Sequence, residues 1–516
     1  MSIVELPSFL CGERAKGEGA AQTLLNPATE APLAEVRPAK DLGRALDFAR
    51  ERGGPALREL SFSERALRLK AIQGVLASAR DELLGLAIAN GGNTRSDAKF
   101  DVDGAIATLS AYADLGQTLG DRRTLLDGEA ALLGRSARWA GQHVLAPRAG
   151  VAVHVNAFNF PAWGLWEKAA QALLSGMPVV AKPATATALL AHRMVELVLD
   201  AGLLPPGALS LVAGPPGDLL AHLAPHDVVA FTGSGDTGAL LRALPAVVRD
   251  SVRVNVEADS LNAAVLGPDV EVGSPTWDLA VGEIAKDQTQ KAGQKCTAIR
   301  RVLVPEALAD ALAEALAERL AAVKIGDPAR EDVTMGPLAT ARQLADVRGR
   351  LERLRGEATP VFGDGSVTPL GVPAEKGFFF GPVLLRCDAP GAARVLHAEE
   401  VFGPVATLAT YDGTAGAAAA LVARGQGGLV ASVYADDRAF LKQVVAGLLP
   451  HHGRVYLGSA KVAGQTAGPG TVLPSLVHGG PGRAGGGEEL GGLRGMAFYL
   501  QRTAVQGDKL LLEAIL

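Results

Sequence analysis

The spacing of apolar residues divides the chain into a helical first part and later parts in which short strands alternate with helices. Residues 41–119 carry apolar side chains at helical intervals, as in 65–72, which predicts helices. From residue 150 short β-rich runs appear, and helical segments at 163–174 and 187–199 separate the first three of them. The predicted strands are 151–155, 178–181, 209–212, 227–231 and 252–256. This alternation is typical of a parallel, doubly wound sheet, which could hold a nucleotide.

A second alternating series follows, and the end of the chain differs from both. The series begins near 263–266 and continues through Cys296 to the strongly helical 305–323. Residues 479–495 are very rich in glycine and precede a strand-like run at 496–502. An isolated terminal strand must pair with something, and a partner subunit is a candidate.

Composition narrows the class of protein. A chain of 516 residues exceeds one ordinary core, so we expect two or three domains. Its 48% hydrophobic and 20% charged residues indicate a soluble globular protein, and the net charge of -5 gives no general attraction to nucleic acid or anionic membranes. No apolar run approaches the roughly 18 residues of a membrane span, and no signal peptide is recognisable. Three scattered cysteines fit a reducing compartment and resemble no zinc site. We therefore expect a cytoplasmic protein without a metal.

Cys296 is the first candidate for catalytic chemistry. It lies between a helical pattern, 284–292, that runs into Gly293 and a strand-like run, 301–304. Such a connection can present the sulfur to a cleft, with Lys295 and backbone N–H groups nearby to favour the thiolate. The alternative is a small buried hydrophobic side chain, the usual fate of a free cysteine.

Two polar residues stand at the ends of predicted strands. Asn159 precedes a helix that Pro161 could begin, so its amide could donate to an oxyanion, and an N-cap asparagine is the alternative. Lys182 ends an apolar strand at the sheet edge where ligands gather, and a solvated lysine is its alternative.

A glycine-containing turn matches a dinucleotide-binding fingerprint. Gly233, Ser234 and Gly238 belong to a Gly-x-Gly-x-x-Gly segment between a strand and a helix. On this interpretation Glu257, about twenty residues later, would bind a ribose hydroxyl. Because 62 of the 516 residues are glycine, a plain strand-to-helix turn is an equal alternative.

Together these segments resemble the aldehyde dehydrogenase superfamily over nearly the whole chain. The signatures occur in family order, at 159–161, 182–183, 231–234, 257, 293–296 and 399–404. The resemblance implies an α/β fold of three parts and a homo-oligomer, most simply a homodimer. These parts are a Rossmann-like cofactor-binding domain (1–130 and 149–258), an α/β catalytic domain (259–480) and a small β oligomerisation arm (131–148 and 481–516).

The resemblance also implies roles for individual residues. Cys296 would be the nucleophile, Glu257 the general base instead of a ribose ligand, and Asn159 with the Cys296 backbone N–H the oxyanion hole. The cofactor would be held by Lys182 and Glu400 at the riboses, by Phe402 at the nicotinamide and by the turn from Gly233 to Gly238 at the pyrophosphate.

The chain departs from the family pattern at two places. It has Glu257-Ala258-Asp259-Ser260 where members usually have Glu-Leu-Gly-Gly, so the backbone of that loop could differ. It has Thr185 where many NAD-preferring members carry a glutamate that would repel a 2′-phosphate. We therefore expect NADP as cofactor, with NAD possible.

A closer likeness is to family members that oxidise CoA-linked semialdehydes in the aerobic breakdown of aromatic acids. It is carried by residues 154–161, 182–187, 257–262, 291–301 and 478–489. Because the chain ends at Leu516, without room for the hydratase domain fused to the phenylacetate enzyme, we expect the benzoate type, with 3,4-dehydroadipyl-CoA semialdehyde as substrate. The open alternatives are the oxepin-CoA-derived semialdehyde of phenylacetate breakdown and a general aldehyde.

Two other functions are possible for a chain with these residues. In an acylating dehydrogenase free CoA would take the acyl group, but Glu257, as an activator of water, argues against it. A binding protein without activity would have no need of Cys296, Glu257 and Asn159 together.

Overall fold

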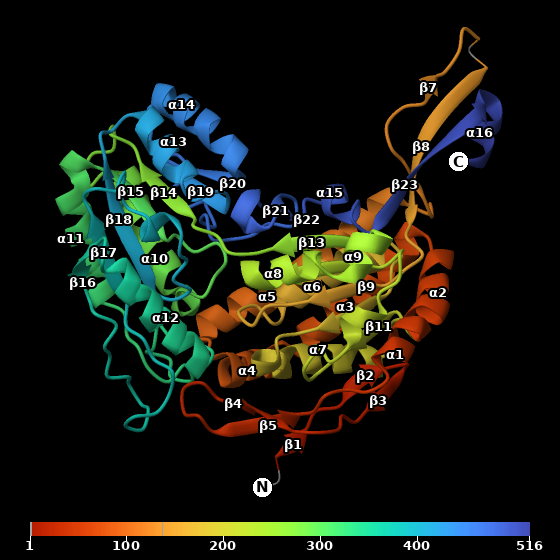
Figure 1. Ribbon diagram of the computed structural model, residues 1–516, viewed down its shortest axis with the longest axis horizontal. Coiled ribbons are helices and arrows are strands. Elements are labelled where there is room, and N and C mark those ends of the chain that lie inside the picture. The colour runs from red at the N-terminus through yellow and green to blue at the C-terminus, as the bar shows by residue number, and fades with distance from the viewer. Residues whose placement is uncertain (1–2, 137) are drawn as a thin grey trace.

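Two seven-stranded sheets organise the chain, and a smaller sheet projects from them (Figure 1). The computed structural model describes residues 3–136 and 138–516. No helix within those residues combines the length and the apolarity that crossing a membrane requires.

The first sheet contains all five strands predicted between residues 151 and 256. Its order is β13-β12-β9-β10-β11-β2-β3. The bounds are β2 (Ser8–Leu10), β3 (Glu13–Ala15), β9 (Ala152–Val155), β10 (Val179–Lys182), β11 (Leu209–Leu211), β12 (Val228–Thr232) and β13 (Arg253–Glu257). The five later strands run parallel, and β2 joins β11 in antiparallel sense. The predicted α/β doubly wound sheet is thereby confirmed.

The order of these strands reverses next to β9. The chain proceeds from β9 to β10 and β11 on one side, and then to β12 and β13 on the other. Ligands of open α/β sheets bind beyond the carboxyl ends of the strands at such a reversal. The loops after β9 and β12 are therefore where a ligand site is expected.

Helices cover both faces of this sheet. They are α1 (Leu42–Phe48), α2 (Gly54–Glu59), α3 (Phe62–Ser78), α4 (Arg80–Gly91), α5 (Arg95–Leu119), α6 (Trp163–Leu174), α7 (Ala188–Asp200), α8 (Gly235–Arg242) and α9 (Pro245–Asp250). Helix α3 begins at a capping box, in which Ser61 Oγ accepts from the Glu64 N–H at 3.2 Å and Glu64 Oε2 accepts from the Ser61 N–H at 2.8 Å. Helix α6 is buried almost all round, and it carries Glu167 and Lys168 into the interior.

The second sheet has the order β16-β17-β18-β15-β14-β19-β20. Its strands are β14 (Ala263–Leu266), β15 (Arg301–Pro305), β16 (Thr359–Phe362), β17 (Val383–Cys387), β18 (Val405–Tyr411), β19 (Gly428–Tyr434) and β20 (His452–Gly458). Its helices are α10 (Pro275–Thr289), α11 (Ala309–Ala321), α12 (Ala341–Leu354), α13 (Ala415–Ala423) and α14 (Arg438–Leu448). Except for β16, neighbouring strands are parallel, as the second alternating series predicts.

The projecting sheet forms the arm at the upper right of Figure 1. It contains β6 (Leu125–Leu126), β7 (Ala131–Leu132), β8 (Trp139–Pro147) and β23 (Leu500–Asp508), and α16 (Lys509–Ile515) follows. Strand β23 pairs with β8 of the same chain along its whole length. The terminal strand predicted at 496–502 is therefore present, but it begins at Leu500, after α15 (Leu493–Met496), and its partner in the structure is a strand of the same chain.

The remaining strands join the ends of the chain to its body. Strands β1 (Val4–Glu5), β4 (Gln22–Leu25) and β5 (Pro32–Val36) form a three-stranded sheet. Strands β21 (Val477–Gly479) and β22 (Glu488–Leu490) form a hairpin-like pair that flanks the glycine-rich segment.

Candidate active site

A cavity of about 320 Å³ lies at the strand-order reversal of the first sheet. The loops after β9, β12 and β13 line one side, and residues of the second sheet's half line the other. The latter residues are Cys296, Gln343, Asp346, Arg350, Glu400 and Phe402. The cavity therefore lies between the halves of the molecule that the two sheets organise.

A narrower pocket of about 40 Å³ meets this cavity. Phe100, Phe160, Trp163 and Val472 give it a largely apolar wall. Five residues line both spaces: Ala157, Asn159, Thr232, Glu257 and Cys296. All three residues predicted to carry the chemistry are thus brought to one junction.

The loop that carries Cys296 reverses direction sharply after α10. The helix ends at Thr289, earlier than predicted, and Lys291 and Ala292 take left-handed φ values of 54° and 52°. Non-glycine residues seldom adopt this region, and such strain gathers at functional sites. Gly293 follows with φ 69°, where a Cβ would lie 2.3 Å from the Gly403 carbonyl oxygen, so the close approach of these backbones requires glycine.

Lys295 does not support the Cys296 thiolate as expected. Its Nζ pairs with the Asp287 carboxylate and donates to Gln290 Oε1 at 3.0 Å, and it lines neither of the two spaces that meet at Cys296. Burial, followed by the nearby charge of Glu257, raises the pKa of the Cys296 thiol. The predicted role of Lys295 was wrong because its ammonium group forms an ion pair with Asp287 on α10.

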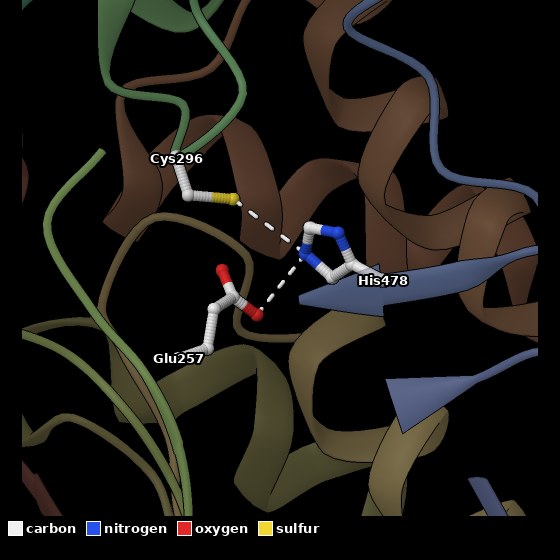
Figure 2. Close-up of side chains that lie close together, drawn as sticks. All are labelled: Glu257, Cys296 and His478. Carbon is white, nitrogen blue, oxygen red and sulfur yellow. Dashed lines mark hydrogen bonds and ion pairs between the residues drawn. The ribbon is translucent and has the colours of Figure 1, made fainter. Parts of the chain in front are cut away.

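Glu257 and His478 face Cys296 from two other elements, β13 and β21 (Figure 2). His478 Nε2 lies 3.0 Å from Glu257 Oε2 and 3.9 Å from Cys296 Sγ. Burial opposes ionisation of both groups, but the attraction between them outweighs it, so the pKa of Glu257 is lowered and the pKa of His478 is raised. The other oxygen, Glu257 Oε1, has no hydrogen-bond partner within the described residues. It is therefore free to accept from a water molecule or a substrate.

A buried lysine lies behind Glu257. Lys168 Nζ lies 2.9 Å from Glu489 Oε2, 2.7 Å from Thr232 Oγ1 and 3.2 Å from Glu167 Oε1. Burial raises the pKa of Glu167 to about 7, whereas the surrounding carboxylates outweigh burial and raise the pKa of Lys168. Lys168 thus remains positive, and its charge helps to keep Glu257 ionised.

The Asn159 side chain is anchored to the cysteine loop. Its Nδ2 donates to the Gln294 backbone oxygen at 2.9 Å. A side-chain amide has two N–H donors, so one remains for a ligand at the junction. This position is compatible with the predicted oxyanion role.

Several predicted cofactor residues line the larger cavity. Gly233, Ser234, Glu400 and Phe402 do so, and Phe402 packs edge-on against Phe158 with ring centroids 5.9 Å apart. Glu400 accepts from the Ser260 N–H at 3.2 Å, and burial raises its pKa to about 7. Gly238 packs against Val256 and does not line this cavity.

Asp259 changes the turn between β12 and α8. Its Oδ1 accepts from the Gly235 N–H at 3.1 Å, while Ser234 Oγ accepts from the Thr237 N–H at 3.3 Å. Two of the first N–H groups of α8 are therefore satisfied by side chains of the protein, and Asp259 lines the same cavity. A pyrophosphate there must meet this carboxylate, a consequence of the departure from Glu-Leu-Gly-Gly.

Lys182 and Thr185 lie beside Ala184, which lines the cavity, although they do not line it themselves. Lys182 is only 4% exposed, and its Nζ contacts the Pro183 carbonyl and Thr185 Oγ1, the latter at 3.4 Å. Burial lowers the pKa of Lys182 to about 8. An incoming anion would therefore favour the charged form of this lysine.

Neither His478 nor Lys168 is among the site residues that the sequence predicts. His478 lies at the start of residues 478–489, one of the stretches that carry the closer resemblance. Lys168 could have been noticed in the sequence, because Glu167 and Lys168 are the only charged residues of the largely apolar segment 163–174.

Cys296, Glu257 and His478 are also of metal-binding types, and their donor atoms lie close together. His478 Nε2, the atom that faces both partners, is engaged with Glu257. We therefore interpret the cluster as a nucleophile with acid–base groups. The larger cavity, with its aromatic wall and the Glu400 carboxylate, fits a dinucleotide.

The chain belongs to the aldehyde dehydrogenase family, whose model matches residues 15–505. It is therefore an enzyme that oxidises aldehydes. It is 49% identical to a 3,4-dehydroadipyl-CoA semialdehyde dehydrogenase from Aromatoleum evansii over 480 residues, which cover 93% of both chains. Its structure resembles lactaldehyde dehydrogenase from Escherichia coli, with a TM-score of 0.84, 25% identity and coverage of 98% and 100% of the two chains. It also shares its fold with a betaine aldehyde dehydrogenase from Staphylococcus aureus, solved with NAD+, with a TM-score of 0.84, 22% identity and coverage of 98% of each chain.

Proposed function

We propose that the protein oxidises an aldehyde to a carboxylic acid through a thioester on Cys296. The observation that carries this proposal is the meeting of two spaces at Cys296, Glu257 and Asn159. The narrow apolar pocket suits the aldehyde, and the larger cavity suits the cofactor. The nucleophile, the base and the oxyanion donor stand where the two ligands would touch.

The proposed reaction has two halves. In the first, the Cys296 sulfur attacks the aldehyde carbon, and the free N–H of Asn159 with the Cys296 backbone N–H stabilises the oxyanion, an effect of roughly 3–4 kcal/mol per donor in comparable sites. The bound nicotinamide cofactor supplies the hydride acceptor. In the second, Glu257 takes a proton from a water molecule, which attacks the thioester and releases the acid.

We infer that the chain is divided as its sheets suggest. The first sheet and its helices (1–130 and 149–258) bind the cofactor, residues 259–480 form the catalytic domain, and 131–148 with 481–516 form the arm. Residues 1, 2 and 137 of these ranges lie outside the described part of the chain. Within the last range, β22 and α15 pack against α6, and the projecting part begins at β23.

The proposed substrate is a CoA-linked semialdehyde, with 3,4-dehydroadipyl-CoA semialdehyde as the first choice. The relative with this activity in its name spans nearly all of both chains. The pocket beside Cys296 is too narrow for a CoA group, so the CoA would lie outside it and supply remote binding energy.

If the substrate is CoA-linked, its kcat/KM should exceed that of free medium-chain aldehydes by about tenfold or more. The panel should include the semialdehyde from phenylacetate breakdown and be run with both cofactors. Equal kcat/KM values would indicate a general aldehyde dehydrogenase. Added free CoA should leave the acid product unchanged, whereas its consumption would indicate the acylating class.

We infer that NADP is preferred to NAD. Lys182 has no carboxylate partner among the described residues, and Thr185 beside it carries no charge that would repel a 2′-phosphate. Thr185→Glu is expected to lower kcat/KM for NADP about tenfold or more by like-charge repulsion and to spare NAD. Thr185→Gln is the uncharged control of the same size. Steady-state assays in which the wild-type protein prefers NAD by an order of magnitude would contradict the inference.

We infer that the arm makes the protein a homodimer. Leu132, Trp139 and Leu510 on the arm are 58%, 51% and 71% exposed, and β23 is an edge strand of the projecting sheet. Exposed apolar edges of this kind are normally covered. Light scattering at micromolar concentration should give the mass of a dimer, and a stable monomer there would disprove this.

A further inference from the structure

His478 lies between the nucleophile and the base and has no part in the proposed reaction. Its imidazole enters from β21 and faces Cys296 and Glu257 at once (Figure 2). The side chains of His478 and Glu257 are 4% and 2% exposed, so solvent does not dissipate their interaction.

The glycine-rich segment brings His478 to this place. At Gly479, with φ 142°, a Cβ would lie 2.0 Å from the Gly487 carbonyl oxygen, so the segment folds back on itself only with glycine there. The Gly487 N–H donates to the Val256 oxygen at 3.1 Å, and the Ala258 N–H donates to the Ala484 oxygen at 3.0 Å. These bonds hold the segment to the backbone on both sides of Glu257. The segment thereby aligns His478 with Glu257.

The Cys296 thiolate needs a positive partner that the predicted residues do not supply. Lys295 is paired with Asp287, and Lys168 lies behind Glu257. A carboxylate facing a thiol disfavours the thiolate, and a protonated imidazole beside both offsets that effect.

We propose that His478, in its protonated form, is the catalytic group that stabilises the Cys296 thiolate, because it neutralises Glu257 and lies 3.9 Å from the sulfur. This inference rests on the proposed function of Cys296. As the S–H bond breaks, its proton leaves through the cavity to solvent water. The S–C bond then forms with the aldehyde carbon, and the carbonyl electron pair moves to the oxygen.

Other charged groups act on this pair. Those near His478 or Cys296 are Glu167 and Lys168 on α6, Arg454 on β20, Glu489 opposite His478 on β22, and the pair of Arg300 with Glu400. Glu167 reinforces the effect of Glu257 on the His478 pKa, while Arg454 and burial oppose it. The attraction of these two carboxylates outweighs burial and Arg454, so the pKa of His478 is raised above its usual value.

The test is the alkylation of Cys296 by iodoacetamide as a function of pH, without substrate, followed by mass spectrometry of the Cys296 peptide. His478→Gln keeps a donor toward Glu257 but cannot become cationic. We expect its alkylation rate near neutral pH to fall at least about tenfold and the midpoint of its profile to rise by about one pH unit or more.

Two controls separate this role from a structural one. Alkylation of Cys11, in the same sample, should be unchanged, and His222→Gln, at an exposed histidine paired with Asp218, should match the wild-type protein. Retained binding of NADPH will show that each variant is folded. A His478→Gln profile that overlays the wild-type profile, or is lowered equally at every pH, would overturn the proposal. If the wild-type protein kept its turnover after alkylation of Cys296, the proposed function itself would fail instead.

Discussion

Replacing Cys296 with alanine is expected to abolish turnover and to leave cofactor binding largely intact. Its sulfur is the nucleophile at the junction of the two spaces, and no other cysteine lines either of them. Loss of a covalent nucleophile typically lowers kcat by several orders of magnitude, so we expect a decrease of about 10⁴-fold or more. Steady-state formation of NADPH measures turnover, and NADPH fluorescence measures binding.

The other two cysteines provide matched controls. Cys387 is buried in the core of the second sheet, and Cys11 lies in a turn next to the first sheet. Alanine at either position should leave turnover within about twofold of the wild-type value, because substitutions away from a site seldom change its chemistry. Near-normal turnover by the Cys296→Ala protein would disprove the thioester mechanism.

The sequence predicted the parts of the fold that have a strong local pattern. The β-branched runs at 151–155 and 227–231 became β9 and β12, and the segment 163–174 became α6. Buried parallel strands read as continuous apolar runs, which explains why these predictions were confirmed. The positions of Asn159 and Gly233 just after strands also placed them at the cavity, because parallel strands present their carboxyl ends to the same edge.

Features that depend on distant pairing were not predictable from local pattern. The terminal strand found its partner in β8, more than 300 residues earlier in the chain, as the register of Leu500 opposite Pro147 shows. Lys295 is a second example, because its ammonium group pairs with Asp287 on α10 and not with its neighbour in the chain, Cys296. Single-sequence reasoning sees neighbours along the chain, whereas pairing of charges and strands is decided in space.

The arrangement of His478 shows why a recognised motif can be incomplete. The chemistry of Cys296 and Glu257 follows from residue type and family order, but their charges depend on a histidine about 180 residues after Cys296. Burial alone would raise the pKa of Glu257, and the imidazole reverses that direction. The ionisation state of the base was therefore accessible only from the assembled site.

Replacing Glu257 with glutamine is expected to slow the second half of the reaction selectively. Glutamine cannot take a proton from water, so steady-state turnover should fall by about 10²-fold to 10⁴-fold, the usual size of general-base catalysis. Its amide oxygen can still accept from His478 Nε2, and the negative charge that opposes the thiolate is removed. Acylation should therefore persist, and rapid mixing with NADP and aldehyde should show a burst of NADPH close to one equivalent per Cys296, followed by a slow phase.

The size of the burst separates the possible roles of Glu257. Glu399→Gln is the matched control. The Glu399 carboxylate is next to Glu400 in the chain, but it pairs with Arg353 and lines neither of the two spaces at Cys296. This variant should show wild-type kinetics. Normal steady-state turnover in the Glu257→Gln protein would return Glu257 to a structural or ribose-binding role. Loss of the burst together with slow turnover would show that Glu257 acts earlier, when Cys296 attacks the aldehyde and before the thioester forms.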